Sequence, residues 1–437
     1  MHPDSAETLE ALRRGDLAGA RALRFAGGLT DFPREILGLA DSLEVLDLGP
    51  GALTDLPADL GRLTRLRVLF CSGNRFARLP PALGDCPALS QIGCRGAGVV
   101  EVPGEALPPR LRWLTLTDNR IAALPEALGA RPHLQKLMLA GNRLAALPGS
   151  LAGASALELL RLAANRFEAL PGWLAELPRL AWLAYAGNPC EPAPPAAEAP
   201  AIPHAAVRVG AMLGEGASGR VHRAVWQDGE QARPVALKLF RGAMTSDGLP
   251  EREMAACLAA GTHPNLTGGL GRLVGHPAGT DGLLMPLLPA GWGALAGPPS
   301  LETCSRDVYP PDLALAPETG LRLLRAAAAA TAHLHARGLL HGDVYAHNLL
   351  WDGHAGAAVL SDFGAASVLP AGVAGVALRR LEVRALGLLV GEVLDRCAPA
   401  PPLRALEAAC VQPDPAARPT AVDLCAALDR FSLERLR

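Results

Sequence analysis

A leucine repeat of nearly constant period occupies the first half of this chain of 437 residues. The first leucines of the repeats stand 22 or 23 residues apart, at Leu43, Leu66, Leu89, Leu111, Leu134, Leu157 and Leu180. Each begins a version of L-x-x-L-x-L-x-x-N, and a Leu-Pro or Val-Pro pair recurs with the same period. A unit this short cannot bury its own leucines, so successive units must stack and share one core. The period therefore predicts a stacked array of short strands.

This pattern resembles the leucine-rich repeat, whose period is about 20 to 29 residues. The resemblance covers residues 25–188 and implies an α/β solenoid of about seven repeats, in which the asparagines bond a ladder of backbone groups. The ladder is imperfect, because Gly51 and Ala97 occupy asparagine positions. Residues 1–24 are expected to form a helical cap on the open end.

In such a solenoid the short strands form a concave face, and the residues that flank the inner leucines point outward from it. We predict that this face binds a protein substrate or ligand. Its expected anchors include aromatic and basic side chains, which often dominate binding energy: Phe70, Arg95, Trp113, Lys136, Met138, Arg161 and Trp182. The alternative is a generic solenoid surface with a few exposed apolar residues.

The repeat pattern stops at residues 189–204, which contain six prolines interspersed with alanines. Such a composition predicts a semi-rigid spacer between two domains. The second domain is expected to span residues 205–437.

A glycine-rich stretch and a lysine open the second half. Gly214, Gly216 and Gly219 fit the pattern G-x-G-x-x-G-x-V that ends at Val221, and Lys238 ends the run Val-Ala-Leu-Lys. Lys238 is one of only two lysines among 41 Lys and Arg residues, which suggests that arginine would not serve there. A compact ammonium acts on nucleotide phosphates as a point charge, which a broad guanidinium fork does not imitate.

Two further motifs follow in order. His341-Gly342-Asp343-Val344-Tyr345-Ala346-His347-Asn348 comes after an alanine-rich helical pattern, and Ser361-Asp362-Phe363-Gly364 comes soon after it. Near the end, residues 414–419 read D-P-A-A-R-P. Glycine loop, lysine, H-x-D-x-x-x-x-N and D-F-G are the signatures of protein kinases.

The second half therefore resembles a protein kinase, and the whole chain resembles the bacterial leucine-rich-repeat protein kinases. The resemblance implies an α+β bilobal domain that uses ATP and Mg²⁺. It implies that Asp343 accepts the proton of the substrate hydroxyl, and that Asn348 and Asp362 hold magnesium. Lys238 would pair with a helix glutamate, Glu253 or alternatively Glu251, and the backbone near Leu288 would recognise adenine.

Several positions depart from the kinase pattern. Gly342 replaces the arginine of H-R-D, and no A-P-E motif is visible. Ser367 is the only hydroxyl residue between Phe363 and Glu382, so we expect no classical activation-loop phosphorylation. Tyr345 stands where serine/threonine kinases carry lysine. His347 stands where tyrosine kinases carry arginine, and it either supplies part of the missing phosphate-binding charge or only fills the loop.

Three functions remain open from the sequence. The first is an active protein kinase, with serine or threonine as the expected acceptor. The second is a pseudokinase scaffold that binds nucleotide and partner proteins without catalysis. The third is a kinase-like phosphotransferase that acts on a small molecule.

Composition limits the binding partners and the cellular location that we expect for this protein. The net charge of −2 gives no sign of nonspecific binding to nucleic acid or to an anionic membrane. No uninterrupted apolar run reaches about 18 residues, so no transmembrane helix is expected. The nine cysteines are scattered, without metal-like spacing, and are expected to be reduced thiols. The start of the chain lacks a basic-then-apolar signal, and a cytoplasmic location is expected.

Overall fold

The computed structural model describes residues 5–195, 199–242, 244–397 and 401–431. It separates into two compact units, Met1–Leu177 and Pro178–Arg437. The sequence placed the domain boundary in the proline-rich segment 189–204. In the structure the last repeat, which begins at Pro178, instead groups with the second unit.

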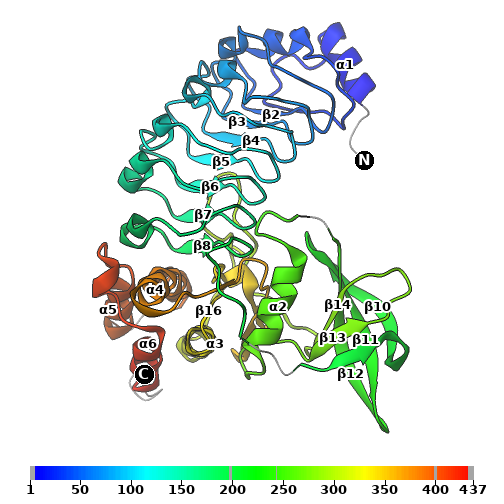
Figure 1. Ribbon diagram of the computed structural model, residues 1–437. Helices are drawn as coiled ribbons and strands as arrows, with labels where there is room; N and C mark the ends of the chain where they lie inside the picture. Colours follow the sequence, from blue (N-terminus) through cyan, green and yellow to red (C-terminus); the bar gives the residue numbers. More distant parts are fainter. Residues whose placement is uncertain (1–4, 196–198, 243, 398–400, 432–437) are drawn as a thin grey trace. The chain divides into compact units, whose positions relative to one another are not determined.

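The first unit is an array of three-residue parallel strands, one for each repeat (Figure 1). Equivalent positions pair in register, so Leu46 faces Leu69 and Leu114 faces Leu137. Its strands are β1 (Ala22–Arg24), β2 (Val45–Asp47), β3 (Val68–Phe70), β4 (Gln91–Gly93), β5 (Trp113–Thr115), β6 (Lys136–Met138) and β7 (Leu159–Arg161).

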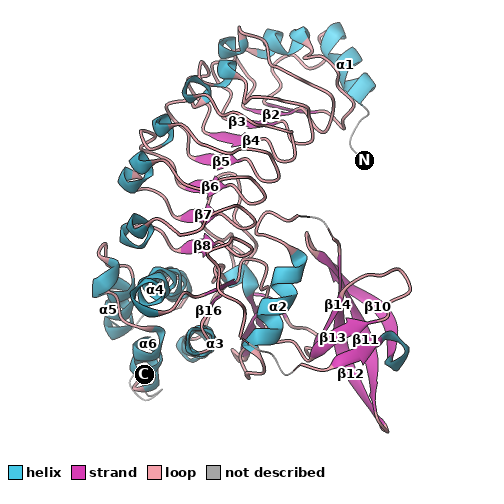
Figure 2. Ribbon diagram, in the orientation of Figure 1, coloured by secondary structure: helices cyan, strands magenta, loops and turns pink. Residues whose placement is uncertain are grey.

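Each repeat returns through a short 3-10 helix of three to six residues, and Figure 2 shows these helices along one side of the array and the strands along the other. The turns are η1 (Arg34–Leu39), η2 (Leu60–Arg62), η3 (Pro81–Leu83), η4 (Gly104–Ala106), η5 (Glu126–Leu128), η6 (Gly149–Gly153) and η7 (Gly172–Glu176). A proline at the N-terminal boundary of most of these turns explains the recurrent Leu-Pro pair, because proline has no N–H to lose at a helix start. Before them, helix α1 spans Ser5–Arg14, and β1 already begins within the segment expected to be a helical cap.

The asparagines bond the backbone of neighbouring repeats. The Asn119 side chain accepts hydrogen bonds from the N–H groups of Ala97 and Val99, at 3.1 and 2.9 Å. It donates to the carbonyl oxygens of Cys94 and Leu116, at 2.8 and 2.9 Å. Asn119 is buried, and these bonds satisfy backbone groups that no regular element pairs.

Two cysteines depart from the expectation of free thiols. Cys71 and Cys94 occupy equivalent positions in neighbouring repeats, with their Cα atoms 5.0 Å apart, and the structure pairs them as a disulfide. The repeat period brings them together, because the in-register array stacks residues separated by 23 positions.

The second unit begins with strand β8 (Trp182–Ala184) of the last repeat and continues into a six-stranded sheet of order β10-β11-β12-β14-β13-β9. The sheet strands are β9 (Ala201–Pro203), β10 (Val207–Glu215), β11 (Gly219–Asp228), β12 (Gln231–Phe240), β13 (Gly271–Val274) and β14 (Gly282–Pro286). The end of the expected spacer therefore forms edge strand β9, which pairs in parallel with β13. Helix α2 (Pro250–Ala260) follows β12.

The rest of the second unit is mainly helical. Its helices are α3 (Pro317–Ala336), α4 (Gly372–Leu394), α5 (Pro401–Cys410) and α6 (Ala421–Asp429), with single 3-10 turns η8 (His204–Ala206), η9 (Ala346–Asn348) and η10 (Pro415–Ala417). Two small sheets carry the functional loops, with strands β15 (Gly293–Ala294), β16 (Leu339–Leu340), β17 (Leu349–Trp351), β18 (Ala358–Leu360) and β19 (Ser367–Val368). A sheet-rich lobe thus precedes a helical lobe, and the predicted fold class of a solenoid followed by a bilobal domain is confirmed.

None of the helices that the structure describes is both long enough and apolar enough to cross a bilayer.

Candidate active site

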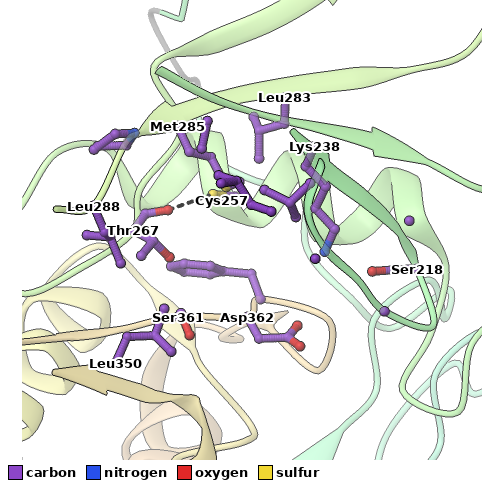
Figure 3. A pocket seen from close by; sticks show the side chains of 18 of the residues that line it. Ser218, Lys238, Cys257, Thr267, Leu283, Met285, Leu288, Leu350, Ser361 and Asp362 are labelled. Atoms are coloured by element: carbon purple, nitrogen blue, oxygen red, sulfur yellow. Dashed lines mark hydrogen bonds between the residues drawn. The ribbon is translucent and has the colours of Figure 1, made fainter. Parts of the chain in front are cut away.

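A cavity of about 640 Å³ lies between the six-stranded sheet and the D-F-G segment. In Figure 3, Lys238 lies above Asp362 toward one end of the cavity, and the apolar side chains of Met285 and Leu288 lie toward the other end. Leu283 lines the cavity beside Lys238, its partner on the neighbouring strand. The glycine-rich stretch also lines this cavity, including Gly214, Gly216, Gly219 and Val221. One end of the cavity is therefore apolar, and the other end carries charge.

The three glycines of the loop differ in what they do. A Cβ atom on Gly219 would collide with the carbonyl oxygen of Leu239 in β12, so close packing of β11 on β12 requires glycine there. A Cβ on Gly214 or Gly216 would meet nothing within 4 Å. These two glycines leave open space in the loop, where a backbone can approach phosphate groups closely.

Lys238 and Glu253 form an ion pair between β12 and α2. Both side chains are largely buried, at 12% and 5% exposure, whereas Glu251 is exposed. Burial is the largest influence on Glu253 and raises the pKa of its carboxyl, which the charge of Lys238 opposes. The structure thus brings Lys238 together with Glu253, and not with the alternative Glu251.

The catalytic-loop residues converge beside the cavity. The Asn348 amide nitrogen donates to the backbone oxygen and to the carboxylate of Asp343, at 2.9 and 2.8 Å. The backbone oxygen of Asn348 in turn accepts hydrogen bonds from the backbone N–H and hydroxyl of Ser361. Asp362 has φ +63°, an uncommon conformation for a non-glycine residue, and such strained residues cluster at functional sites.

His347 lies between two aspartates. Its Nδ1 atom is 2.7 Å from the carboxylate of Asp307, and its Nε2 atom is 3.8 Å from that of Asp343. Burial lowers the pKa of His347, but the hydrogen bond to Asp307 and the charge of Asp343 outweigh it, and the pKa is raised. The imidazole is therefore held in its cationic form next to Asp343 over a wider pH range than a free histidine.

Two residues of the site were missed by sequence reasoning. Asp307 lies in the Gly- and Pro-rich segment 290–318, which fits no recognised motif, and its side chain is fully buried against His347. Trp292 lines the cavity from the same segment. Trp292 could have been predicted, because tryptophan is rare in this chain and Trp292 comes just after the segment expected to bind adenine. Asp307 had none, because its partner is 40 residues away.

The residues present fit a magnesium ion that is shared with a nucleotide. No cluster of three or more His, Cys, Asp or Glu side chains that could hold a metal occurs among the described residues. Magnesium, however, is commonly held by one or two protein ligands together with substrate phosphates. The Asp362 carboxylate lines the cavity, and the bonds to Asp343 use the amide nitrogen of Asn348 and so leave its oxygen to serve as a ligand.

The predicted partner-binding face is only partly exposed. Phe70, Arg95 and Trp113 are half-buried, whereas Lys136, Met138 and Arg161 are buried. Within the first unit the Lys136 ammonium lies 4.0 Å from the centre of the Trp113 ring, a cation–π contact. Trp182 requires a correction: it is 2% exposed and packs on Tyr345 of the second unit, so it is not a free anchor for an external partner.

Comparison with known proteins agrees with this architecture. Residues 109–167 match the family model described as leucine rich repeat, and residues 207–373 match the one described as protein tyrosine and serine/threonine kinase. A solved leucine-rich-repeat protein of Leptospira interrogans is 22% identical over 43% of this chain and 54% of its own length, with a TM-score of 0.37. No curated protein sequence matches the chain.

The chain thus combines leucine-rich repeats with a protein kinase domain. The matched kinase model spans the cavity, the catalytic loop and the D-F-G segment. Its description covers tyrosine and serine/threonine kinases together and does not discriminate between acceptor hydroxyls.

Proposed function

We propose that this protein is an active ATP- and magnesium-dependent protein kinase, with serine or threonine as its acceptor. The observation that carries the proposal is a cavity lined by the Lys238–Glu253 ion pair and Asp362. The hydrogen-bonded pair Asp343 and Asn348 is joined to it through Ser361, which lines the cavity and bonds the Asn348 backbone oxygen. Phosphoryl transfer depends mainly on positioning and charge neutralisation, and these groups supply both.

Each group then has a defined task. The apolar end of the cavity, with Leu288, would hold the adenine, and the open loop at Gly214 and Gly216 would cover the phosphates. Lys238, fixed by Glu253, orients the phosphates as a point charge. Asp362 and Asn348 would hold magnesium, which would supply positive charge to neutralise that of the transferred group.

Asp343 is the general base of this proposal. As the acceptor oxygen bonds to the γ-phosphorus and the bond to the ADP oxygen breaks, the acceptor hydroxyl passes its proton to the Asp343 carboxylate. Asn348 holds that carboxylate at 2.8 Å. Cationic His347, which Asp307 orients, faces Asp343 at 3.8 Å and would supply positive charge in place of the lysine absent at Tyr345.

The repeats are proposed to recruit the protein substrate. The side chains of Phe70, Arg95 and Trp113 are half-buried, so part of each one is exposed on this unit. They share the strand-bearing side of the first unit with a cavity of about 470 Å³ that is lined by Phe70 and by residues of the first two strands.

Transfer of labelled γ-phosphate from magnesium-ATP to a generic protein acceptor tests the proposal. We expect label on protein from the wild type, and a loss of about 100-fold or more in Asp343→Ala and Lys238→Met. Phosphoamino-acid analysis of the label would identify the acceptor hydroxyl. Binding of magnesium-ATP without any transfer to protein would contradict a protein kinase, and a screen of small alcohols would then separate a pseudokinase from a small-molecule phosphotransferase.

A further inference from the structure

Residues 178–191, here called the clamp segment, pack against the catalytic loop within the second unit. The Trp182 ring lies parallel to the Tyr345 ring, with centroids 4.2 Å apart and an angle of 7° between planes. Its indole N–H donates to the backbone oxygen of Val344 at 3.0 Å. Trp182 therefore holds the two residues that directly follow the general base Asp343.

The Trp182–Tyr345 pair is itself enclosed by the segment that carries Asp307. The Tyr345 hydroxyl donates to the backbone oxygen of Ser305 at 3.1 Å. The Arg306 guanidinium lies 5.2 Å from the centre of the Trp182 ring. The position at which serine/threonine kinases carry a lysine is thus used here for packing.

The clamp segment also bonds the short stretch that follows Phe363 and Gly364. The Tyr185 N–H donates to the Ser367 hydroxyl at 3.0 Å, and the Tyr185 hydroxyl donates to the backbone oxygen of Val368 at 2.6 Å. The Val368 N–H donates to the Glu191 carboxylate at 3.0 Å. Glu191 also lies 3.6 Å from Arg252 of α2, the helix that carries Glu253.

Gly342 shows why an arginine cannot stand before Asp343. It has φ +74°, and a Cβ there would lie 2.5 Å from the backbone oxygen of Ala365 and 2.7 Å from that of Leu183. Leu183 belongs to β8 of the clamp segment. The backbone of the last repeat thus occupies the space beside Gly342 that any side chain would need.

The start of the clamp segment is held by two buried arginines of the helical lobe. Arg418 donates to the backbone oxygen of Pro178 at 3.0 Å, and Arg384 donates to that of Arg179 at 3.1 Å. Arg418 also donates to the backbone oxygens of Gln412 and Arg380. The chain has no A-P-E motif whose glutamate could pair with Arg418. The guanidinium of Arg418 donates its hydrogen bonds to backbone oxygens instead.

We propose that the clamp segment holds the catalytic loop and residues 365–369 in the arrangement for phosphoryl transfer, in place of a phosphate group on that stretch. Trp182 and Tyr185 are positioning residues in this scheme, and Ser367 is no phosphorylation site. The idea rests on the proposed kinase function. It requires that the kinase domain begin at Pro178. The sequence suggested a later start, after the proline-rich segment 189–204.

Variants of the full chain test the clamp with two readouts, phosphoryl transfer and amide hydrogen exchange. We expect Trp182→Ala to lower kcat about tenfold or more, because small displacements of a catalytic loop are costly, with little change in the Kd for magnesium-ATP. Exchange at residues 344–348 and 365–369 should rise. Tyr185→Phe, which removes one hydroxyl, should raise exchange at residues 365–369 and lower kcat by a smaller factor.

A matched control separates clamping from general damage to the repeats. Trp173→Ala removes a half-buried tryptophan from η7, outside the clamp segment, and should leave both readouts unchanged. Wild-type exchange and kcat in both Trp182→Ala and Tyr185→Phe would overturn the clamp. If the wild type transfers no phosphate, the kinase proposal fails, and the exchange readout still decides the clamp by itself.

The phosphate side of the proposal has its own test. Ser367 is 1% exposed, so a charge placed there must displace the Tyr185 bond. We expect Ser367→Glu to lower kcat about tenfold or more, and mass spectrometry of the active wild type to find Ser367 unmodified. A more active Ser367→Glu variant, or loss of activity when phosphatase removes a phosphate from Ser367, would overturn the clamp.

Discussion

His347 and Asp307 are joined twice, although 40 residues separate them. The Asp307 carboxylate accepts a hydrogen bond from the His347 backbone N–H at 3.0 Å and lies 2.7 Å from its Nδ1 atom. This pairing fixes both the ring and the backbone of a residue four positions after the proposed base. Segment 290–318, which the sequence left without an explanation, thereby becomes part of the catalytic loop's support.

The charge of His347 predicts the alkaline limb of the pH profile. Its pKa is raised by Asp307 and Asp343 in spite of burial, so the cation is present below that pKa and is lost as the pH rises through it. We expect kcat to fall on the alkaline side, and His347→Lys to move that fall to higher pH. His347→Ala should lower kcat roughly 10- to 100-fold. An alkaline limb that is the same in all three proteins would show that His347 only fills the loop.

Asp307→Asn tests the role of the His347 cation by changing the aspartate that pairs with it. The amide oxygen of asparagine can still accept a hydrogen bond, but the negative charge that raises the pKa of His347 is gone. We expect the alkaline limb of kcat to move to lower pH by about one unit. Asp312→Asn, an exposed aspartate of the same segment, is the control and should leave the profile in place.

Glu253→Gln should weaken transfer by freeing Lys238. The variant removes the charge that pairs with Lys238 but keeps nearly the same volume in a buried site. We expect kcat/KM for ATP to fall about tenfold or more, since a displaced lysine no longer aligns the phosphates. Glu251→Gln, two residues away on the exposed side of α2, should match the wild type. Equal losses in the two variants would contradict the assignment of Glu253.

Asn119→Ala should destabilise the repeats. It leaves the buried N–H groups of Ala97 and Val99 without an acceptor, which costs about 2–4 kcal/mol of unfolding free energy. A urea titration of the full chain, followed by circular dichroism, should show an earlier unfolding transition. Arg120→Ala changes an exposed neighbour and should leave the midpoint unchanged. A wild-type midpoint for Asn119→Ala would refute the ladder as a source of stability.

Glu392→Gln should stabilise the protein at alkaline pH. Burial, with a further contribution from Asp307, raises the pKa of Glu392 to about 7. A carboxyl with a raised pKa favours the folded state fully only below its ordinary pKa of 4.5, and this contribution is lost as the pH rises from there to about 7. The neutral amide avoids the loss, so we expect a gain of about 1–3 kcal/mol at pH 8 and almost none at pH 4. Thermal unfolding of the variant and the wild type at the two pH values measures this gain in stability. An equal gain at both pH values would contradict a destabilising Glu392 carboxylate.

Local spacing was enough to predict most of the fold. The 22- or 23-residue period predicted the array of strands and the asparagine ladder, because each repeat meets only its neighbours. The glycine loop, Lys238 and the catalytic loop were recognisable because phosphoryl transfer requires those groups at short, fixed separations. Glu253 could be chosen over Glu251 only by spacing from a later motif, and the ion pair with Lys238 supports that choice.

Predictions that depended on exposure or on long-range contact were less successful. Trp182 has the sequence position of a surface anchor, yet its ring lies on Tyr345, 163 residues along the chain. Cys71 and Cys94 were expected to be free thiols, and stacking of the repeats brings them together. The repeat pattern reports which side of a strand a residue occupies, and it contains no information on what later covers that side.

The sequence by itself determined the two kinds of fold and was enough to predict which groups would react, because both depend on spacings of fewer than 30 residues. Only the tertiary structure decided where the kinase unit begins and what supports its catalytic loop. Those features depend on contacts between distant segments: Trp182 with Tyr345, Tyr185 with Val368, and Asp307 with His347. Such contacts form only when the whole unit packs, and they leave no periodic mark in the chain.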